Sequence, residues 1–319
     1  MQVLTDISAQ NTMFVSFISS LAILAVCIVI GYISRKVGVF TDTLNVGMST
    51  VLVKVTLPCV IFVSMMRPFS QTLLMESLAT LFITAAVYLS GFWIGMGLAR
   101  LMGAAEDEKR VWQFALVFAN VGYMGFPIIQ AVYGYEGMIY ATMANVSFNI
   151  LAFSLGVYLF KRDTSGAVKA NLKAIILNPA LVATYLGFLF FVTGLRLPAV
   201  VQDGISLVGD ITVPLSMMLV GSILAKSRLL SLVNDPRVLP VIFMRLLGIP
   251  LAAFFILRLF VHNSVMLGVI VMLAATPAAA LTVIFAEQYK GNTAAASKIV
   301  ALSSILCLLS IPLISLILQ

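Results

Sequence analysis

Apolar windows of about 20 residues, the length that crosses the ~30 Å hydrocarbon core of a bilayer, recur along the chain. Of the 319 residues, 61% are hydrophobic and only 10% are charged, which excludes a water-soluble domain of ordinary composition. The connectors between the windows are short and polar, so no separate soluble domain is expected. The chain is predicted to be an all-α integral membrane protein.

The windows predict ten transmembrane helices. The expected spans are residues 14–34, 43–66, 72–101, 110–133, 137–160, 174–194, 202–225, 237–261, 265–288 and 294–318. The first window has no basic segment before it and is followed by Arg35 and Lys36. It is therefore interpreted as a retained helix rather than a cleaved signal peptide.

Basic residues predict the orientation. With the N-terminus outside, the outer loops hold Arg67, Arg196 and Arg258, whereas the inner loops hold Arg35, Lys36, Arg100, Lys109, Arg110, Lys161, Arg162, Lys169, Lys173, Lys226, Arg228, Arg237 and Lys290. This imbalance predicts a multi-pass protein of the cell membrane, plasma or inner, with both termini outside. The net charge of +7 then reflects contacts with membrane lipids, and no nucleic-acid partner is expected.

The most polar connector, Lys161–Lys173, separates five predicted spans from five more. Because five is odd, the second half enters the membrane from the opposite side. The expected organisation is a single membrane domain made of two inverted five-helix repeats, residues 1–163 and 164–319.

Short sequence matches support the repeat. In the second span Thr56 precedes Pro58 by two residues, and in the seventh span Thr212 precedes Pro214 in the same way. Pro58 and Pro214 are expected to interrupt their helices, since proline removes a backbone donor.

Two windows contain residues that should break a membrane helix. The fourth holds the stretch NVGYMGFP, in which Asn120 is a good helix N-cap and Gly122, Gly125 and Pro127 loosen the backbone. At about 1.5 Å per residue, Asn120 lies about 15 Å into the membrane, near its middle. Helix four of the ten is thus one predicted broken helix, and helix nine is the other for the reasons that follow.

In the ninth window, Thr276 followed by Pro277 resembles the start of a helix at about the same depth. Lipid cannot satisfy the freed N–H and C=O groups, so the breaks should face protein or a watery cavity. Half-helices restarting near Asn120 and Thr276 would aim their positive N-terminal ends at the membrane centre, which suits an anion. Ordinary proline kinks are the alternative interpretation.

At this point the chain resembles a known family. NVGYMGFP, PLSMMLVGSIL (Pro214–Leu224), MRLLGIPL (Met244–Leu251) and ATPAAALTVIFAEQY (Ala275–Tyr289) are similar to the auxin efflux carrier family, which includes malate and malonate permease-like prokaryotic members and PIN-type auxin exporters. The resemblance covers nearly the whole chain. It implies the fold of the bile acid sodium symporters, with crossing broken helices four and nine and an elevator-like movement.

The resemblance also implies binding residues. Asn120 and Val121, with the neighbouring Gly122, and Pro277 and Ala278, with the preceding Thr276, match the crossover where plant members bind the auxin carboxylate. The chain departs from the plant pattern in having Ala119 before the asparagine and in having Ala278 instead of a polar residue. The second departure removes a side-chain donor and puts auxin-like recognition in doubt, but it leaves the backbone dipole site intact.

Polar residues within the spans give further candidates. Lys54 is a candidate for attracting a substrate carboxylate, and Asn145 and Asn149 share a helix face that lines a cavity or bonds a neighbouring helix. The candidates for coupling are Asp210, as a protonatable group, Arg245 and Glu287. Structural pairing is the rival interpretation of Lys54, Asp210 and Arg245, and Glu287 also fits an ordinary interfacial residue.

No motif for chemistry is present. Three cysteines in apolar windows and the lone His262 predict no metal site, and Gly221–Ser227 lacks the second glycine of a phosphate loop. No cofactor and no enzymatic activity are expected. The prediction is a secondary carrier of a small organic anion, a dicarboxylate or an auxin-like carboxylate, with a sodium-coupled symporter, a channel or a receptor as alternatives and a homodimer left open.

Overall fold

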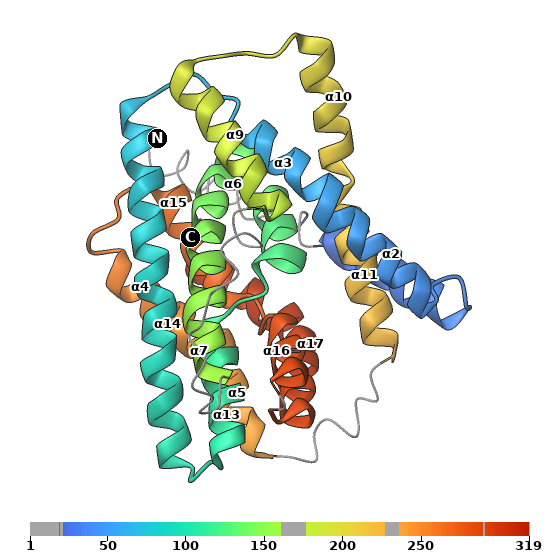
Figure 1. Ribbon diagram of the computed structural model, residues 1–319, viewed down its shortest axis with the longest axis vertical. Helices are drawn as coiled ribbons and strands as arrows, with labels where there is room; N and C mark the ends of the chain where they lie inside the picture. Colours follow the sequence, from blue (N-terminus) through green and yellow to red (C-terminus); the bar gives the residue numbers. More distant parts are fainter. Residues whose placement is uncertain (1–18, 20–21, 161–176, 227–235, 290, 319) are drawn as a thin grey trace, which may run out of the picture.

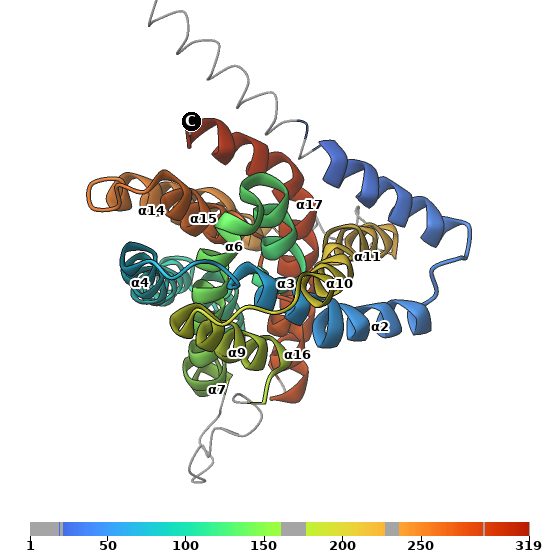
Figure 2. The ribbon, with the colours of Figure 1, turned by 90° about the horizontal axis from the view of Figure 1, so that it is seen from above.

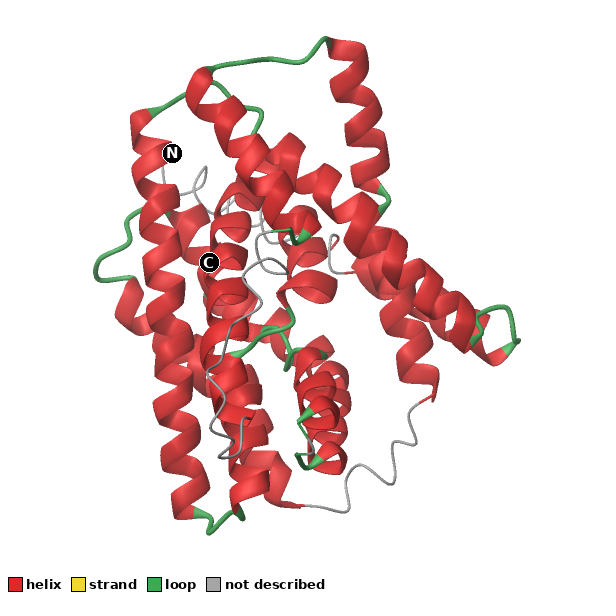
Figure 3. Cartoon of the chain, in the orientation of Figure 1, coloured by secondary structure: helices red, strands yellow, loops and turns green. Residues whose placement is uncertain are grey.

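The computed structural model describes residues 19, 22–160, 177–226, 236–289 and 291–318. Within these ranges the chain is helical and forms no strand, apart from one isolated bridge between two residues (Figure 3). The start of the first predicted span and the connector Lys161–Lys173, with the proposed boundary between the halves, lie outside the described residues.

The helices follow the predicted spans closely. The first part of the chain holds a helix over residues 22–36, α2 (Asp42–Val51), η1 (Leu52–Thr56), α3 (Leu57–Ser64), α4 (Gln71–Leu101), α5 (Glu106–Val117), η2 (Val121–Gly125), α6 (Phe126–Leu151), η3 (Ala152–Gly156) and α7 (Val157–Phe160). The second part holds α9 (Pro179–Thr193), α10 (Ala199–Asp210), α11 (Thr212–Lys226), η4 (Pro236–Val238), α13 (Leu239–Phe243), η5 (Met244–Gly248), α14 (Ile249–Leu257), α15 (Ser264–Ala275), α16 (Leu281–Gln288) and α17 (Thr293–Ile317).

The described residues contain six helices that are long and apolar enough to cross a membrane. One of them, Val121–Phe160, joins the second half of the fourth predicted span to the fifth and is interrupted at Gly134, whose φ of 58° no ordinary helix contains. Large apolar side chains such as Phe82, Trp93 and Leu309 are 63–74% exposed on the outside of the molecule. Such a surface requires lipid as its solvent. The protein is an integral multi-pass membrane protein.

The helices form two groups that lie side by side (Figures 1 and 2). In the flanking bundle, α3 packs on α9 and α10, α11 packs on α2, and the helix over residues 22–36 crosses α11. In the core bundle, α4 packs on α5 and α6, and the elements from η4 to α17 pack around α5, α6 and each other. The two bundles meet where α3 and α11 contact η2 and α6.

Four prolines, Pro58, Pro127, Pro214 and Pro250, lie at irregular helical turns rather than at full breaks. Pro58, Pro127 and Pro250 each lie in the first turn of a helix that continues from a π-helical turn, because the missing N–H and the ring prevent regular hydrogen bonding to the preceding turn. Pro214 lies in the first turn of α11, just after the turn at Ile211 that ends α10. Pro58 therefore follows a widened, π-helical turn, and Pro214 follows a single turn residue between α10 and α11. Neither proline separates its helical segments.

Glycines allow the closest helix contacts. A Cβ on Gly91 of α4 would lie 2.6 Å from the carbonyl oxygen of Leu116, so α4 and α5 approach backbone to backbone. In the flanking bundle, a Cβ on Gly31 would lie 2.0 Å from the carbonyl oxygen of Met218, and one on Gly221 would lie 1.9 Å from that of Ile28. Only glycine fits at these crossings, as is usual between membrane helices.

Replacing Gly221 should separate the helix over residues 22–36 from α11. We expect Gly221→Ala to lower the free energy of unfolding by about 1–3 kcal/mol, the usual cost of overpacking. The matched control is Gly97→Ala in α4, where a Cβ meets nothing within 4 Å. Thermal unfolding in detergent measures both variants, and an unchanged midpoint for Gly221→Ala would contradict the close crossing.

Candidate functional site

Two helices of the core bundle stop inside the molecule, and the chain resumes helix a few residues later. Helix α5 ends at Val117 and η2 begins at Val121, while α15 ends at Ala275 and α16 begins at Leu281. The two intervening stretches lie against each other as an antiparallel bridge between Ala119 and Ala278, both fully buried. The predicted interruptions in these two windows are thus present and in contact.

Backbone hydrogen bonds join the two stretches. The N–H of Asn120 donates to the carbonyl oxygen of Pro277 at 2.8 Å, and the N–H of Ala279 donates to that of Phe118 at 2.9 Å. The N–H of Ala278 donates to the hydroxyl oxygen of Ser303 on α17 at 3.1 Å. Backbone groups that lipid could not satisfy are therefore satisfied inside the protein.

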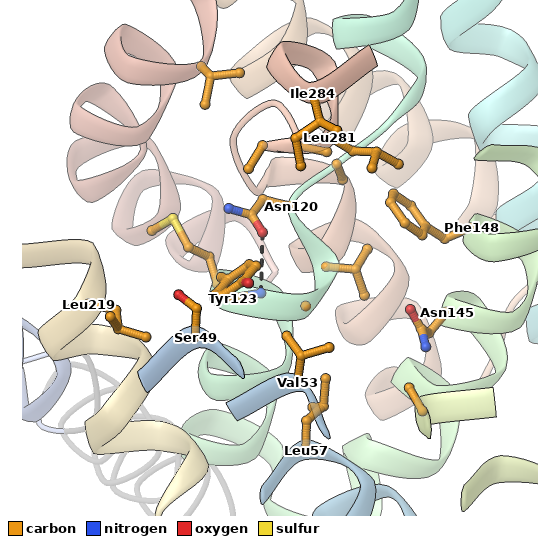
Figure 4. A pocket seen from close by; sticks show the side chains of 18 of the residues that line it. Ser49, Val53, Leu57, Asn120, Tyr123, Asn145, Phe148, Leu219, Leu281 and Ile284 are labelled. Atoms are coloured by element: carbon orange, nitrogen blue, oxygen red, sulfur yellow. Dashed lines mark hydrogen bonds between the residues drawn. The ribbon is translucent and has the colours of Figure 1, made fainter. Parts of the chain in front are cut away.

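Asn120 is a helix N-cap, as predicted. Its side-chain oxygen accepts a hydrogen bond from the N–H of Tyr123 at 3.2 Å (Figure 4), which satisfies one of the donors left free where η2 begins.

The predicted helix start at Thr276 is wrong. Thr276 has an extended backbone and ends α15, its hydroxyl donates to the carbonyl of Leu273 at 2.8 Å, and helix resumes only at Leu281. The carbonyl of Pro277 accepts a bond from Asn120 across the bridge, so the chain stays extended there and the restart is delayed.

A cavity of about 490 Å³ lies beside the paired stretches, between the two bundles. From the flanking bundle it is lined by α2, η1, α3, α9 and α11; from the core bundle, by the two interruptions, α6, η3, α16 and α17. Figure 4 shows Ser49 and Leu219 on one side of this space, and Asn120, Phe148 and Leu281 on the other.

The polar part of the lining consists of neutral side chains. They are Ser49, Asn120, Tyr123, Asn145, Asn149, Asn178 and Ser304. The amide of Asn149 donates to the backbone oxygen of Asn145 at 2.8 Å and to its side-chain oxygen at 3.2 Å, and the amide of Asn178 approaches the oxygen of Asn149 at 3.5 Å. The two predicted asparagines thus both line the cavity and bond to neighbours.

The rest of the lining is apolar. Aliphatic and aromatic side chains such as Val53, Leu57, Phe148, Leu219 and Ile284 make up most of the wall. No Lys, Arg, Asp or Glu lines this cavity within the described part of the chain.

The other predicted binding residues divide into two sets. Val121 and Gly122 line the cavity, as Asn120 does, whereas Thr276, Pro277 and Ala278 lie outside its lining, and Ala279 and Ala280 provide that part of the wall. Lys54 is exposed and lines a second hollow of about 380 Å³. That hollow shares Ser49, Val53 and Tyr123 with the main cavity, so Lys54 is next to the cavity but not in it.

The three coupling candidates occupy different environments. Asp210 is exposed at the end of α10, where its carboxylate accepts hydrogen bonds from the hydroxyl of Tyr135 at 2.9 Å and the amide of Gln130 at 3.3 Å. Both donors belong to α6, so these bonds connect the two bundles. Glu287 is exposed near the end of α16.

Arg245, in contrast, is 1% exposed and lies behind the interruptions. It donates through Nε to the carbonyl of Thr276 at 3.1 Å and through Nη1 to that of Leu116 at 2.9 Å. Its surroundings agree with structural pairing rather than with a place in the cavity lining.

The sequence interpretation missed Asn178, Ser303 and Ser304. Asn178 followed by Pro179 is the typical signal of a helix start, and its side chain indeed caps α9 by accepting from Ala180 at 3.0 Å. No local signal distinguishes Ser303 and Ser304 from other serines in membrane helices, because their roles depend on which segment packs against α17.

Comparison with known proteins agrees with this architecture. A family model described as membrane transport protein matches residues 16–171 and 165–315. The chain belongs to the auxin efflux carrier family of membrane transport proteins.

Two relatives illustrate the match, and both are named as uncharacterized transporters. The chain is 26% identical over 299 residues to an uncharacterized transporter of Methanothermobacter thermautotrophicus, covering 92% of this chain and 95% of the relative. It is 21% identical over 309 residues to the uncharacterized transporter YfdV of Escherichia coli, covering 94% and 97% of the two chains. The chain is thus a membrane transport protein, and these names do not specify a substrate.

Removing the hydroxyl of Ser303 should destabilise the paired stretches. Ser303→Ala leaves the buried N–H of Ala278 without its acceptor, which should cost about 1–3 kcal/mol. The control is Ser304→Ala, because the Ser304 hydroxyl donates only to the Val300 carbonyl of its own helix in this structure. Thermal unfolding compares the two, and equal midpoints would show that the bond to Ala278 contributes nothing.

Proposed function

We propose that this protein is a secondary carrier that moves a small organic anion through the cavity between its two bundles. The observation that carries the proposal is the position of the cavity beside two interrupted, mutually bonded helices. Interrupted helices of this kind are typical of transporter binding sites, where unwound backbone faces the substrate.

The lining supports an anionic substrate. The helices that begin at Val121 and Leu281 leave N–H groups of their first turns without intrahelical partners, and these ends border the cavity. Each helix N-terminus carries the equivalent of about +0.5 charge. Amide groups of Asn120, Asn145 and Asn149 add donors that can bind a carboxylate.

Of the two substrate classes predicted, the lining favours a monocarboxylate with an apolar body over a compact dicarboxylate. The wall is mostly aliphatic and aromatic, and the described residues place no cation in it to pair with a second carboxylate. A second buried charge without a partner would cost several kcal/mol, on the order of the penalty for any unpaired buried ion. Lys54, in the adjoining hollow, is assigned to attracting the anion toward the cavity.

The mechanism proposed is alternating access by movement of the core bundle against the flanking bundle. This elevator-like movement, the two inverted repeats and the crossing of helices four and nine are the arrangement that the family resemblance implies. In the orientation expected from the basic residues, with both termini outside the cell membrane, Lys226 marks the inner end of α11. Ile223 and Leu224, close to that end, line the cavity, which supports a position toward the inner side in this orientation.

Asp210 lies about 24 Å from Lys226 along the helix axis, toward the outer side. Its bonds to Tyr135 and Gln130 join the bundles there, opposite the cavity. We assign this contact to closing the outer side of the carrier.

The competing class is a channel or a receptor, and a sodium-coupled symporter is a variant of the carrier. A channel with the same pocket would show unitary conductance, whereas a carrier shows saturable flux and counterflow. A sodium-coupled symporter would lose transport when sodium is replaced by choline, whereas a uniporter or a proton-coupled carrier would not.

Uptake into proteoliposomes tests the proposal. A panel of radiolabelled mono- and dicarboxylates should identify at least one anion with saturable uptake by the wild type. Asn120→Leu should lower this uptake at least about tenfold, because the variant loses a donor to the carboxylate and the cap of η2.

The control for this variant is Gln202→Leu, which removes an amide side chain of α10 that lines neither the main cavity nor the second hollow. Normal uptake by folded, reconstituted Asn120→Leu would contradict the assignment of the site. Absence of uptake of every anion by the wild type would contradict the carrier itself.

A covalent link between Tyr135 and Asp210 should stop the movement of the bundles. We expect Tyr135→Cys combined with Asp210→Cys, in a chain lacking Cys27, Cys59 and Cys307, to lose uptake after treatment with a short bifunctional maleimide. The matched pair is Glu76→Cys with Asn263→Cys, whose side chains bond at 3.0 Å within the core bundle and should not need to separate. Full uptake by the linked Tyr135 and Asp210 pair would contradict movement between the bundles.

A further inference from the structure

Arg245 is the only charged side chain among the described residues that is buried. It lies on η5 of the core bundle and does not line the cavity. Taking a guanidinium out of water is costly unless hydrogen bonds and opposite charge compensate it. The identity of its partners shows what provides this compensation.

Both partners are carbonyl ends of interrupted helices. Leu116 lies in the last turn of α5, and Thr276 is the C-cap of α15. One guanidinium therefore binds the C-terminal ends of both helices at once, at 2.9 Å and 3.1 Å. Each accepting residue lies three positions along the chain from a residue of the cavity wall, Ala119 or Ala279.

Four helix ends meet at the paired stretches: the C-terminal ends of α5 and α15 and the N-terminal ends of η2 and α16. Their partial charges determine the field in the cavity. Two N-terminal ends contribute about +0.5 each and two C-terminal ends about −0.5 each, so together they sum to about zero. Arg245 adds +1 at the carbonyl ends and cancels them. What remains is about +1 from the N-terminal ends, which face the cavity.

We propose that Arg245 is the residue that makes the cavity selective for anions, although it does not touch the substrate. By cancelling the two helix C-termini, it leaves the two N-termini to act on a carboxylate. This inference rests on the proposed function and adds to it a specificity-determining residue. It also explains how a cavity whose described lining lacks cations can attract an anion in the middle of a membrane protein.

The test compares acids with their uncharged amides. The probe pairs are indole-3-acetate and indole-3-acetamide, phenylacetate and phenylacetamide, and malonate and malonamide, with binding to purified protein measured by calorimetry or thermal shift. The wild type should bind at least one acid more tightly than its amide. Arg245→Gln should reduce this preference by about tenfold, with little change in affinity for the amide.

Two variants separate charge from structure. Arg245→Lys keeps the charge but lacks the forked donors, so it should keep the preference for the acid even if stability falls. Arg258→Gln removes an exposed cation that packs over Phe254 in the same helical segment, and it should leave the preference unchanged. A purely structural role of Arg245 would weaken binding of acid and amide equally.

The outcomes distinguish this inference from the carrier proposal. Equal affinity of the wild type for an acid and its amide would overturn the role of Arg245 without any variant, so the test does not depend on whether Arg245→Gln folds. Loss of the preference in folded Arg245→Lys, or its retention in folded Arg245→Gln, would also overturn it. Failure of the wild type to bind any acid would count against the carrier proposal and would remove this inference with it.

Discussion

The structure depends on satisfying backbone groups where two helices stop inside a membrane protein. Neither lipid nor a regular helix can supply partners for these groups, and each one left unpaired would cost several kcal/mol, as is typical in hydrocarbon. The two stretches bond to each other through the N–H groups of Asn120 and Ala279. Ser303 and Arg245 bond to backbone groups that the bridge does not pair. The cavity is the other consequence, because it lies beside paired stretches whose backbone groups bond mainly within the protein.

All of these bonds join elements of one bundle. The paired stretches, η5 with Arg245 and α17 with Ser303 belong to the core bundle. A displacement between the bundles would therefore leave the interruptions intact and carry them as a unit. The flanking bundle instead has close glycine crossings at Gly31 and Gly221, together with hydrogen bonds between Asn45 of α2 and Ser222 of α11.

Much of this arrangement could be predicted from the sequence. Asn120 is recognisable as an N-cap because its side chain acts within its own turn, and the apolar windows locate helices because side chains that face lipid must be apolar. Local sequence failed at Thr276, where the Thr-Pro signal is overridden by a bond from Asn120, over 150 positions away. The local sequence also could not assign a role to Arg245. The depth of a charged residue in the membrane predicts the free-energy cost of burying it, but not the groups that bond to it.

The same reasoning explains why the cavity polarity comes from asparagines. A charged side chain facing the cavity would lose its water whenever a ligand with an apolar body entered, whereas Asn145, Asn149 and Asn178 are neutral and bond to each other. These bonds are exchanged at small cost when a ligand enters, since neutral amides both donate and accept. A fixed cation is better placed outside the lining, where Nε and Nη1 of Arg245 bond to the carbonyls of Thr276 and Leu116, while its buried Nη2 makes no hydrogen bond among the described residues. In the proposed carrier, adaptable amides in the lining and a fixed charge outside it would together allow binding and release at the same place.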